Sequence, residues 1–162
     1  MSGSSESPVP AEKRASFPPL PYYPIDGQYR VPAALKVVSS DQVIELSTST
    51  GKMRRMRRVG TLDFILKGQS LQLTAFADVE DRQLRRLFVP FGDLTSGTET
   101  YKGGRYLELE RTSTTLYDLD FNRAYHPFCV FNPSYVCPVP PQENRLPVAV
   151  QAGERLPVTN GR

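Results

Sequence analysis

The sequence predicts a mainly β protein, an antiparallel barrel or a two-layer sandwich with a proline-rich C-terminal arm. Several short segments alternate apolar and polar residues and end in turn residues, which is typical of the strands of an antiparallel meander or barrel. The sequence shows no sustained helical period. Its 15 prolines also favour strands and loops over long helices, because proline breaks a helix.

The 162 residues have about the length of one ordinary domain, so we expect a single core. The first twenty residues are mostly Ser, Pro, Glu and Lys, and burial of so few large apolar side chains cannot offset the entropy lost on ordering them. We therefore expect a disordered tail over residues 1–20, one β-rich domain over residues 21–155 and a C-terminal tail over residues 156–162.

The first strands should follow PYYPIDGQYR, where three tyrosines lie among prolines and an Asp-Gly turn; they are RVPAALKVV and QVIELST. The clearest local signal is the next segment, GTLDFILKGQSLQLTAFA, which alternates on both sides of Lys67-Gly68. A two-residue turn there predicts a hairpin, because opposed residues of an antiparallel pair point to the same face. The predicted pairs are Leu66 with Gln69, Phe64 with Leu71 and Leu62 with Leu73.

Three further strands are predicted at LRRLFVPF, GRYLELE and TLYDLDF, each short and bounded by turn residues. In the last of these, Tyr117, Leu119 and Phe121 share one face. The polar residues between them share the other face, so this strand should cover the core with one side only.

Charge and hydropathy limit the classes of partner. A net charge of +3 is too small to indicate nucleic acid or membrane binding. The N-terminus lacks the apolar stretch of a secretory signal, and no segment approaches the ~18 apolar residues of a membrane span. We therefore expect a cytoplasmic protein without a membrane or nucleic-acid partner.

The basic run KMRRMRRVG, residues 52–60, does not change this expectation. As a strand it divides its charge between two faces, with Arg54 and Arg58 on one side and Arg55 and Arg57 on the other. We interpret it as a solvated strand edge, where cations block unwanted pairing. Steering of a small anionic ligand is the next alternative, ahead of nucleic-acid binding.

A first candidate site is the loop FGDLTSGTETYKGGRYLELE, residues 91–110. Its glycines and hydroxyls could cradle an oxyanion, although no Gly-Lys-Ser/Thr of a Walker A motif occurs. The alternative is a long connection whose polar side chains satisfy their own backbone. Asp93, Glu99 and Tyr101 lie in the same span as Arg105, and a carboxylate beside an arginine can orient a ligand or tune a proton transfer.

A second candidate site is the run DFNRAYHPFCVFNPSYVCPVPPQENRLPVAVQAGE, residues 120–154, which holds both cysteines and the only histidine. Buried unreactive thiols, a disulfide, and metal or nucleophilic chemistry remain open for Cys129 and Cys137. With His126 they could bind zinc only if an acid completed the set, and H-x2-C-x7-C is not a specific spacing. We therefore predict no metal and no cofactor.

The prolines of this run fix backbone angles and remove donors, so it should cross the protein as a pre-ordered extended arm. Such an arm would hold polar residues against the sheet as a structural clamp or as the wall of a site. The prolines concerned are Pro127, Pro133, Pro138, Pro140 and Pro141.

Three motifs together resemble a known family: YYPIDGQYRV, FVPFGDLTSGTETYKGGRYLELE and the run of residues 120–154 quoted above. The chain is similar over most of residues 21–155 to the uncharacterised bacterial and archaeal family called domain of unknown function 1684. Many longer members look as if they carry an additional β-rich half upstream, so an activity that needs that half is not expected of this chain. The resemblance implies importance for Asp93, Thr95, Gly97, Glu99, Tyr101, Gly104, Arg105, Tyr106, Asp120, Asn122, Tyr125, Cys129, Cys137, Pro141, Asn144 and Gly153.

Two hypotheses about function follow. In the first, the glycine-rich loop and the proline arm meet at one end of the sheet and bind a small anionic or carbonyl-containing molecule, with acid-base chemistry as an option. In the second, the same residues form an architectural network in a non-enzymatic structural or interaction module. The sequence does not decide whether the protein is an enzyme. The candidate catalytic residues are Asp93, Glu99, Asp120 and Tyr125, and the candidate ligand-binding residues are Thr95, Tyr101, Arg105, Asn122, His126, Asn144 and Arg145.

Overall fold

The computed structural model describes residues 20–132 and 134–157, so most of the two expected tails, and Pro133 of the expected arm, lie outside the described residues. The described chain is mainly β, as predicted. Its strands are β1 (Arg30–Ser47), β2 (Met53–Leu66), β3 (Gln69–Ala77), β4 (Arg86–Phe91), β5 (Arg105–Glu110) and β6 (Leu116–Asp120). Short 3-10 turns add η1 (Gly27–Tyr29), η2 (Phe121–Arg123), η3 (Phe128–Val130) and η4 (Gln142–Asn144).

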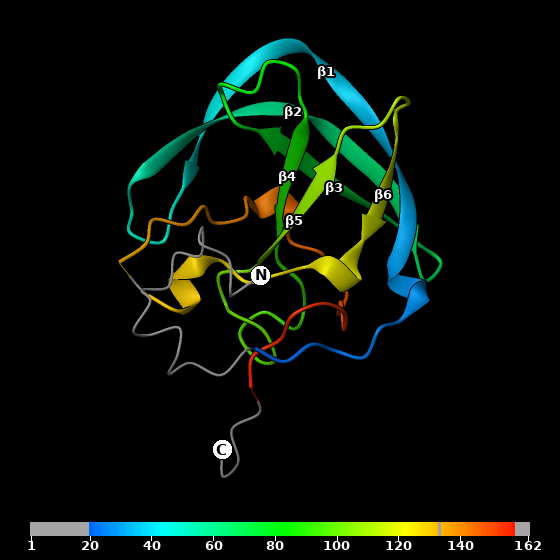
Figure 1. Cartoon of the computed structure of the whole chain (residues 1–162), viewed down its shortest axis with the longest axis vertical. Helices are drawn as coiled ribbons and strands as arrows, with labels where there is room; N and C mark the ends of the chain where they lie inside the picture. The colour runs from blue at the N-terminus through cyan, green and yellow to red at the C-terminus, as the bar shows by residue number, and fades with distance from the viewer. Residues whose placement is uncertain (1–19, 133, 158–162) are drawn as a thin grey trace.

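The strands form one antiparallel sheet of six strands in the order β5-β4-β3-β2-β1-β6. The sheet curls so far that its outer strands, β5 and β6, come into contact (Figure 1). The sheet therefore nearly closes into a barrel, which confirms the first of the two predicted architectures. Barrel closure also removes most of the unpaired edge that an open sheet would expose.

The β2–β3 hairpin has the predicted register. Leu66 pairs with Gln69, and the other two predicted pairs are also present. Both turn residues adopt positive φ, 50° at Lys67 and 83° at Gly68. Such a turn matches the right-handed twist of the strands that it joins.

Strand β1 differs from the prediction, because RVPAALKVV and QVIELST form one long bent strand rather than two. Its pairing with β2 shifts register between Val37 and Gln42. Opposite this bend lies Gly60, where an added Cβ would lie 2.1 Å from the main-chain oxygen of Lys36. The bend therefore depends on a glycine in the partner strand, and it lets β1 pair with β2 and with β6.

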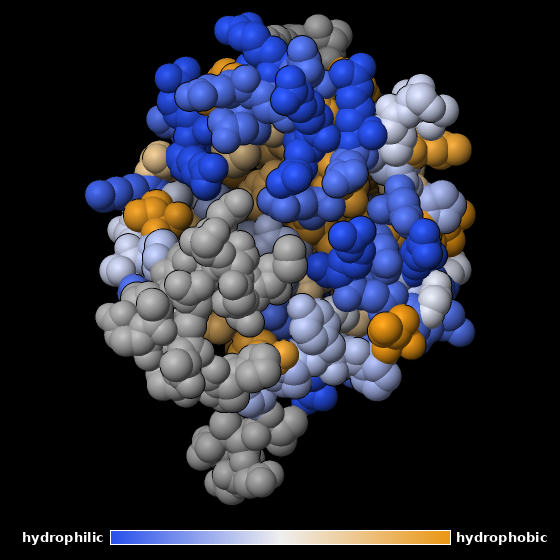
Figure 2. Space-filling model, in the orientation of Figure 1, coloured by the Kyte–Doolittle hydropathy of each residue, from blue (hydrophilic) through white to orange (hydrophobic). Residues whose placement is uncertain are grey.

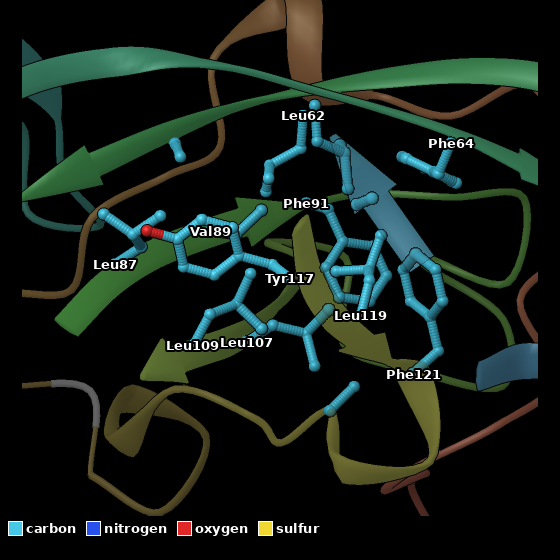
Figure 3. Packing of buried hydrophobic residues seen from close by; sticks show 14 of the residues in the cluster. Leu62, Phe64, Leu87, Val89, Phe91, Leu107, Leu109, Tyr117, Leu119 and Phe121 are labelled. Carbon is cyan, nitrogen blue, oxygen red and sulfur yellow. The ribbon is translucent and has the colours of Figure 1, made fainter. Parts of the chain in front are cut away.

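The core fills the inside of the curled sheet (Figure 3). Every strand contributes alternate residues to it, and Phe91 and Phe121 meet near its end with ring centroids 5.4 Å apart. The predicted apolar face of β6 is buried as expected. Buried members of this cluster include Leu62, Phe64, Leu73, Leu87, Val89, Leu107, Leu109, Tyr117 and Leu119.

A smaller apolar cluster lies on the outer face of the sheet, where Leu46, Met56 and Phe76 are buried together and Phe88 packs against them. The outer surface is otherwise polar over a broad area: in Figure 2, hydrophilic side chains gather over the upper part of the molecule, where Figure 1 shows β1 and β2. Residues 125, 127–128 and 136–138 line a cavity together with Met56 and Phe88 of this outer cluster.

Candidate functional site

Strand β5 sends neighbouring residues to opposite faces of the sheet. Arg105 shares its face with the buried Leu107 and Leu109, so its side chain enters the barrel. Tyr106 and Glu108 point to the outer face. Strand β5 therefore separates an inner polar network around Arg105 from an outer cavity beside Tyr106.

Arg105 closes one end of the barrel. Its Nη1 donates to the carbonyl oxygens of Ala152 at 2.5 Å and Glu154 at 3.0 Å, and its Nη2 donates to that of Val150 at 2.9 Å. Its side chain has no exposed surface, and an oxygen of Asp93 lies 3.7 Å from Nη2. Burial lowers the pKa of Arg105 from its ordinary value, and the Asp93 carboxylate opposes that shift. Four nearby oxygen acceptors thus surround the guanidinium group.

Asp93 is equally engaged. Its Oδ2 accepts from the main-chain N–H of Val150 at 2.6 Å, and both its oxygens lie 2.9 Å from the Thr95 hydroxyl. The hydroxyl of Ser96 donates to Oδ1 at 3.3 Å. The predicted pairing of Asp93 with Arg105 is thus present, but its hydrogen bonds go to the chain itself. At this place the contacts favour an architectural network over an open anion site.

His126 extends the network with a defined tautomer. Its ring has no exposed surface, and Nδ1 lies 3.0 Å from Oε1 of Glu154. Its Nε2 accepts from the main-chain N–H of Tyr101 at 3.2 Å, so Nε2 carries no proton and Nδ1 donates. Glu99 lies nearby in the sequence, and its Oε1 accepts from the Tyr23 hydroxyl at 2.5 Å. These residues join the glycine-rich loop to both ends of the described chain.

Asp120 and Asn122 form a separate group. Asp120 accepts from the main-chain N–H and the amide of Asn122 at 3.0 Å and 2.9 Å. Asn122 in turn exchanges hydrogen bonds with the main chain of Asp26. This pair fastens η1 beside β6, and none of the contacts found among the described residues joins it to Arg105. The structure therefore does not bring Asp120 and Arg105 into one hydrogen-bonded pocket.

Asn144 compensates for a gap in the sheet. Strands β3 and β4 pair only at Phe76 with Phe88. The fully buried Asn144 accepts from the main-chain N–H of Thr74 at 2.8 Å and donates to the carbonyl oxygens of Thr74 and Pro90 at 2.9 Å and 2.8 Å. It thus satisfies backbone groups that would otherwise lack partners where the two strands diverge.

Arg145, beside Asn144, is exposed and passes over Gly92, whose hypothetical Cβ would lie 2.9 Å from Nη1 of Arg145. The main chain of Gly92 also donates to Asn144 at 3.0 Å and accepts from Leu146 at 2.7 Å. The glycine-rich loop and the C-terminal segment therefore lie side by side, but Arg145 makes none of the described contacts of Arg105.

Tyr125 is the one candidate residue that lines the outer cavity, which has a volume of about 370 Å³. Its ring packs edge-on against that of Tyr106, with centroids 5.8 Å apart, and Tyr106 packs likewise on Phe88 at 4.7 Å. Burial and then the Glu108 carboxylate raise the pKa of Tyr125, so its hydroxyl stays protonated. Met56 and Phe128 add further apolar wall.

The segment after η3 forms the far wall of this cavity. Tyr106 donates its hydroxyl hydrogen to the carbonyl oxygen of Pro138, and Cys137 lies beside it. Burial raises the pKa of Tyr106. The cavity therefore lies between the outer face of β5 and the residues around Pro127 and Pro138, and it opens to solvent.

The charged residues that line the cavity differ in the hydrogen bonds and ion pairs that they make with the protein. Arg86 faces Glu108 at 3.8 Å. Asp81 accepts from the main-chain N–H groups of Arg85 and Arg86 at 3.1 Å and 3.2 Å, and these bonds lower its pKa. Arg54 also lines the cavity, and among the described side chains it has no hydrogen-bond or ion-pair partner. It is the cation that remains available.

Arg54 was not among the predicted site residues, because its run was interpreted as a solvated edge, with steering of a small anionic ligand as the next alternative. Residues 53–58 form an edge only on the side of β3, because pairing with β3 begins at Arg57. On the other side the same residues pair with β1. The cavity opens where β2 lacks its β3 neighbour. Alternation with Arg55 and Met56 could have placed Arg54 on the outer face, but only the fold shows what lies opposite.

Across residues 20–132 and 134–157, no group of three or more His, Cys, Asp or Glu side chains is placed to hold a metal ion. In the same residues no helix has the length and apolar character needed to cross a membrane.

Comparison with known proteins gives a family but no activity. The chain matches the model of a family described as "Protein of unknown function (DUF1684)" over residues 15–155. It is similar to an uncharacterized protein of Haloarcula marismortui, whose solution NMR structure shares 44% sequence identity and a TM-score of 0.74, over 93% of this chain and 83% of that one. No curated protein matches.

Proposed function

The chain belongs to the DUF1684 family of proteins of unknown function, and from its geometry we propose that it binds a small molecule with an apolar, preferably aromatic, body and one anionic group in the outer cavity. The position of Arg54 carries this proposal: a guanidinium without a protein partner among the described residues lies on the wall of an aromatic cavity. Arg54 is exposed, so its charge is partly screened by solvent, and an anion that docks in the cavity would complete its hydrogen bonds.

The size and lining of the cavity support the proposal. A volume of about 370 Å³ is within the range of small-molecule sites, which are mostly apolar with a few polar groups that fix orientation. The rings of Phe88, Tyr106 and Tyr125 present edges and faces to a flat ligand. The hydroxyl of Tyr125 is engaged by the Glu108 carboxylate, so Tyr125 supports a ligand through its ring.

Binding is proposed here, and no reaction. A reaction would need a group whose protonation state changes during turnover, whereas the tyrosines of the cavity have raised pKa values and Asp81 a lowered one. The cavity contains one of the four candidate catalytic residues, Tyr125. Glu99, Asp93 and Asp120 lie in the polar networks described above.

A second role is supported by a different observation. The guanidinium of Arg105 donates to three main-chain carbonyl groups of the segment around Ala152, with no exposed surface. We assign this inner network to architecture: it fastens the C-terminal segment to the barrel. Because the network and the cavity lie on opposite faces of β5, both roles are compatible in one chain.

The proposal is tested by NMR titration of the full chain with phenylacetate and with its uncharged isostere phenylacetamide. Phenylacetate should shift the amide signals of cavity residues saturably. It should bind about two- to fivefold more tightly than the amide, because an ion pair with an exposed arginine is worth at most about 1 kcal/mol.

Matched variants identify the cation. Arg54→Gln should abolish the preference for phenylacetate over phenylacetamide, whereas Arg55→Gln, on the other side of the same strand, should retain it. Equal binding of the two probes to the wild-type chain, or a preference that survives in Arg54→Gln, would refute the proposed anion site.

A further inference from the structure

The two cysteines are neighbours in space. Both are free thiols, 7% exposed at Cys129 and 6% at Cys137. The main-chain N–H of Cys129 donates to the sulfur of Cys137 at 3.2 Å. The Cβ of Cys129 is two bonds from that nitrogen, so the sulfur of Cys137 lies beside the base of the Cys129 side chain.

Hydrogen bonds of the described residues hold the two cysteines in place. The N–H of Asn132 donates to the carbonyl oxygen of Phe128 and that of Tyr135 to Asn132, both at 3.1 Å. Cys137 also exchanges hydrogen bonds with Ser49, through its carbonyl at 2.9 Å and its N–H at 3.2 Å. Because folding already brings the two cysteines together, forming the disulfide costs little further loop-closure entropy.

We propose that Cys129 and Cys137 are a reversible redox pair, which forms an intrachain disulfide with a small disulfide oxidant such as oxidised glutathione. Because Cys137 lines the outer cavity, this oxidation would alter the cavity wall. The effect of oxidation on ligand binding in the cavity rests on the proposed function, whereas formation of the disulfide does not. The position of Cys137 also gives a small oxidant a route to its sulfur.

Formation of the disulfide needs no reactant other than oxidised glutathione. A thiolate of Cys137 attacks one sulfur of oxidised glutathione, forms a mixed disulfide and releases one glutathione thiolate. The thiol of Cys129 then loses its proton and attacks the Cys137 sulfur, which forms the intrachain bond and releases the second glutathione. The protein loses two electrons and two protons, and the two glutathione molecules that leave carry them as thiols.

The surroundings make this reaction slow at neutral pH. Burial raises the pKa of the Cys137 thiol to about 11. The thiol of Cys129 lies 3.8 Å from the hydroxyl of Tyr101. The cavity that Cys137 lines also holds the hydroxyl of Tyr106, the cations of Arg54 and Arg86, and the carboxylates of Asp78, Asp81 and Glu108. At pH values below that pKa, the rate should rise about tenfold for each unit by which the pH is increased, because only the thiolate reacts.

Intact mass spectrometry tests the proposal on the full chain. After incubation of the reduced protein with oxidised glutathione, the folded chain should lose the mass of two hydrogen atoms, and reduced glutathione should restore it. Proteolysis under non-reducing conditions should then link the peptides of Cys129 and Cys137.

Two controls separate the outcomes. Cys129→Ser and Cys137→Ser should each stop at one glutathione adduct. A folded wild-type chain that stays reduced, or that gains glutathione without closing the bond, while the denatured chain forms the disulfide, would overturn the proposal. NMR shifts on oxidation should concentrate at Phe128 and Val136 and leave Gly68 unchanged; this readout does not depend on whether phenylacetate binds.

Discussion

Arg105 donates from Nη2 to the carbonyl oxygen of Val150 at 2.9 Å, and so joins strand β5 to a segment 45 residues later. The guanidinium group does not point toward solvent or toward the outer cavity. It occupies the end of the barrel, 5.2 Å above the ring of Phe91. Its planar set of five donors can serve several carbonyl groups at once, which a lysine could not do with the same geometry.

Replacement of this group should weaken the fold strongly. We expect Arg105→Met to lower the free energy of unfolding by about 3–5 kcal/mol, because it leaves the Asp93 carboxylate and three carbonyl groups without their cation. Urea denaturation measures the loss. Arg123→Met, at an exposed arginine, should change stability by less than about 0.5 kcal/mol. Equal stability of the two variants would show that the inner network is not structural.

The amide of Asn144 should be nearly as important. Asn144→Ala leaves Thr74 with an unpaired N–H, and it also removes the donor to the carbonyl oxygens of Thr74 and Pro90, all in a buried place. Each orphaned group costs about 1–3 kcal/mol, so a total loss of about 3 kcal/mol or more is expected. Hydrogen exchange should also quicken at Thr74. The exposed Gln142→Ala should do neither, and unchanged protection at Thr74 in the Asn144 variant would contradict this role.

Local and long-range features differ in how far the sequence could predict them. The β2–β3 register was predictable, because alternation and the Lys67-Gly68 turn are properties of adjacent residues. The inward faces of the other short strands were predictable for the same reason, whereas the continuity of β1 through its bend was not. Even the inward direction of Arg105 could have been inferred, since it alternates with Leu107 and Leu109.

The partners of these side chains could not be inferred in the same way. Arg105 and Asn144 bind main-chain groups, and a carbonyl oxygen has the same chemistry at every residue. A sequence pattern therefore marks a polar residue as notable but does not distinguish a ligand from the backbone as its partner. The cavity beside Arg54 depends on where β3 stops pairing with β2, which is a property of the whole sheet.

Alkaline pH should destabilise the fold through Cys137. Burial raises the pKa of its thiol from 9.0 to about 11, and burial together with Cys129 raises that of Tyr101 from 10.0 to about 12. The unfolded chain therefore loses these protons first, so stability is fully present below pH about 9 and falls as the pH rises toward 11. Urea midpoints across this range provide the measurement. Cys137→Ala should flatten the decline, and an identical pH dependence in both chains would exclude the thiol as its cause.

Two glycines with similar backbone angles provide a test of how tightly the glycine-rich loop packs against the C-terminal segment. Gly104 has φ of 92° and Gly68 has φ of 83°, so alanine is strained at both positions. At Gly104 an added Cβ would also lie 2.6 Å from the carbonyl oxygen of Phe91 and 2.7 Å from Cγ of Pro140, whereas at Gly68 nothing lies within 4 Å. Gly68→Ala should therefore cost about 1 kcal/mol, and Gly104→Ala about 3 kcal/mol or more, because neither a main-chain oxygen nor a proline ring can move aside cheaply.

Thermal and urea unfolding of the two variants measure this difference directly. Because both substitutions carry the same penalty for positive φ, any excess in Gly104→Ala reports the contact between Gly104, Phe91 and Pro140. A Pro140→Ala change combined with Gly104→Ala should recover part of that excess, since it removes one of the two obstructing groups. If the two glycine variants lose equal stability, the segment that carries Pro140 does not pack against the loop as described, and the wall of the outer cavity next to it would lose its support.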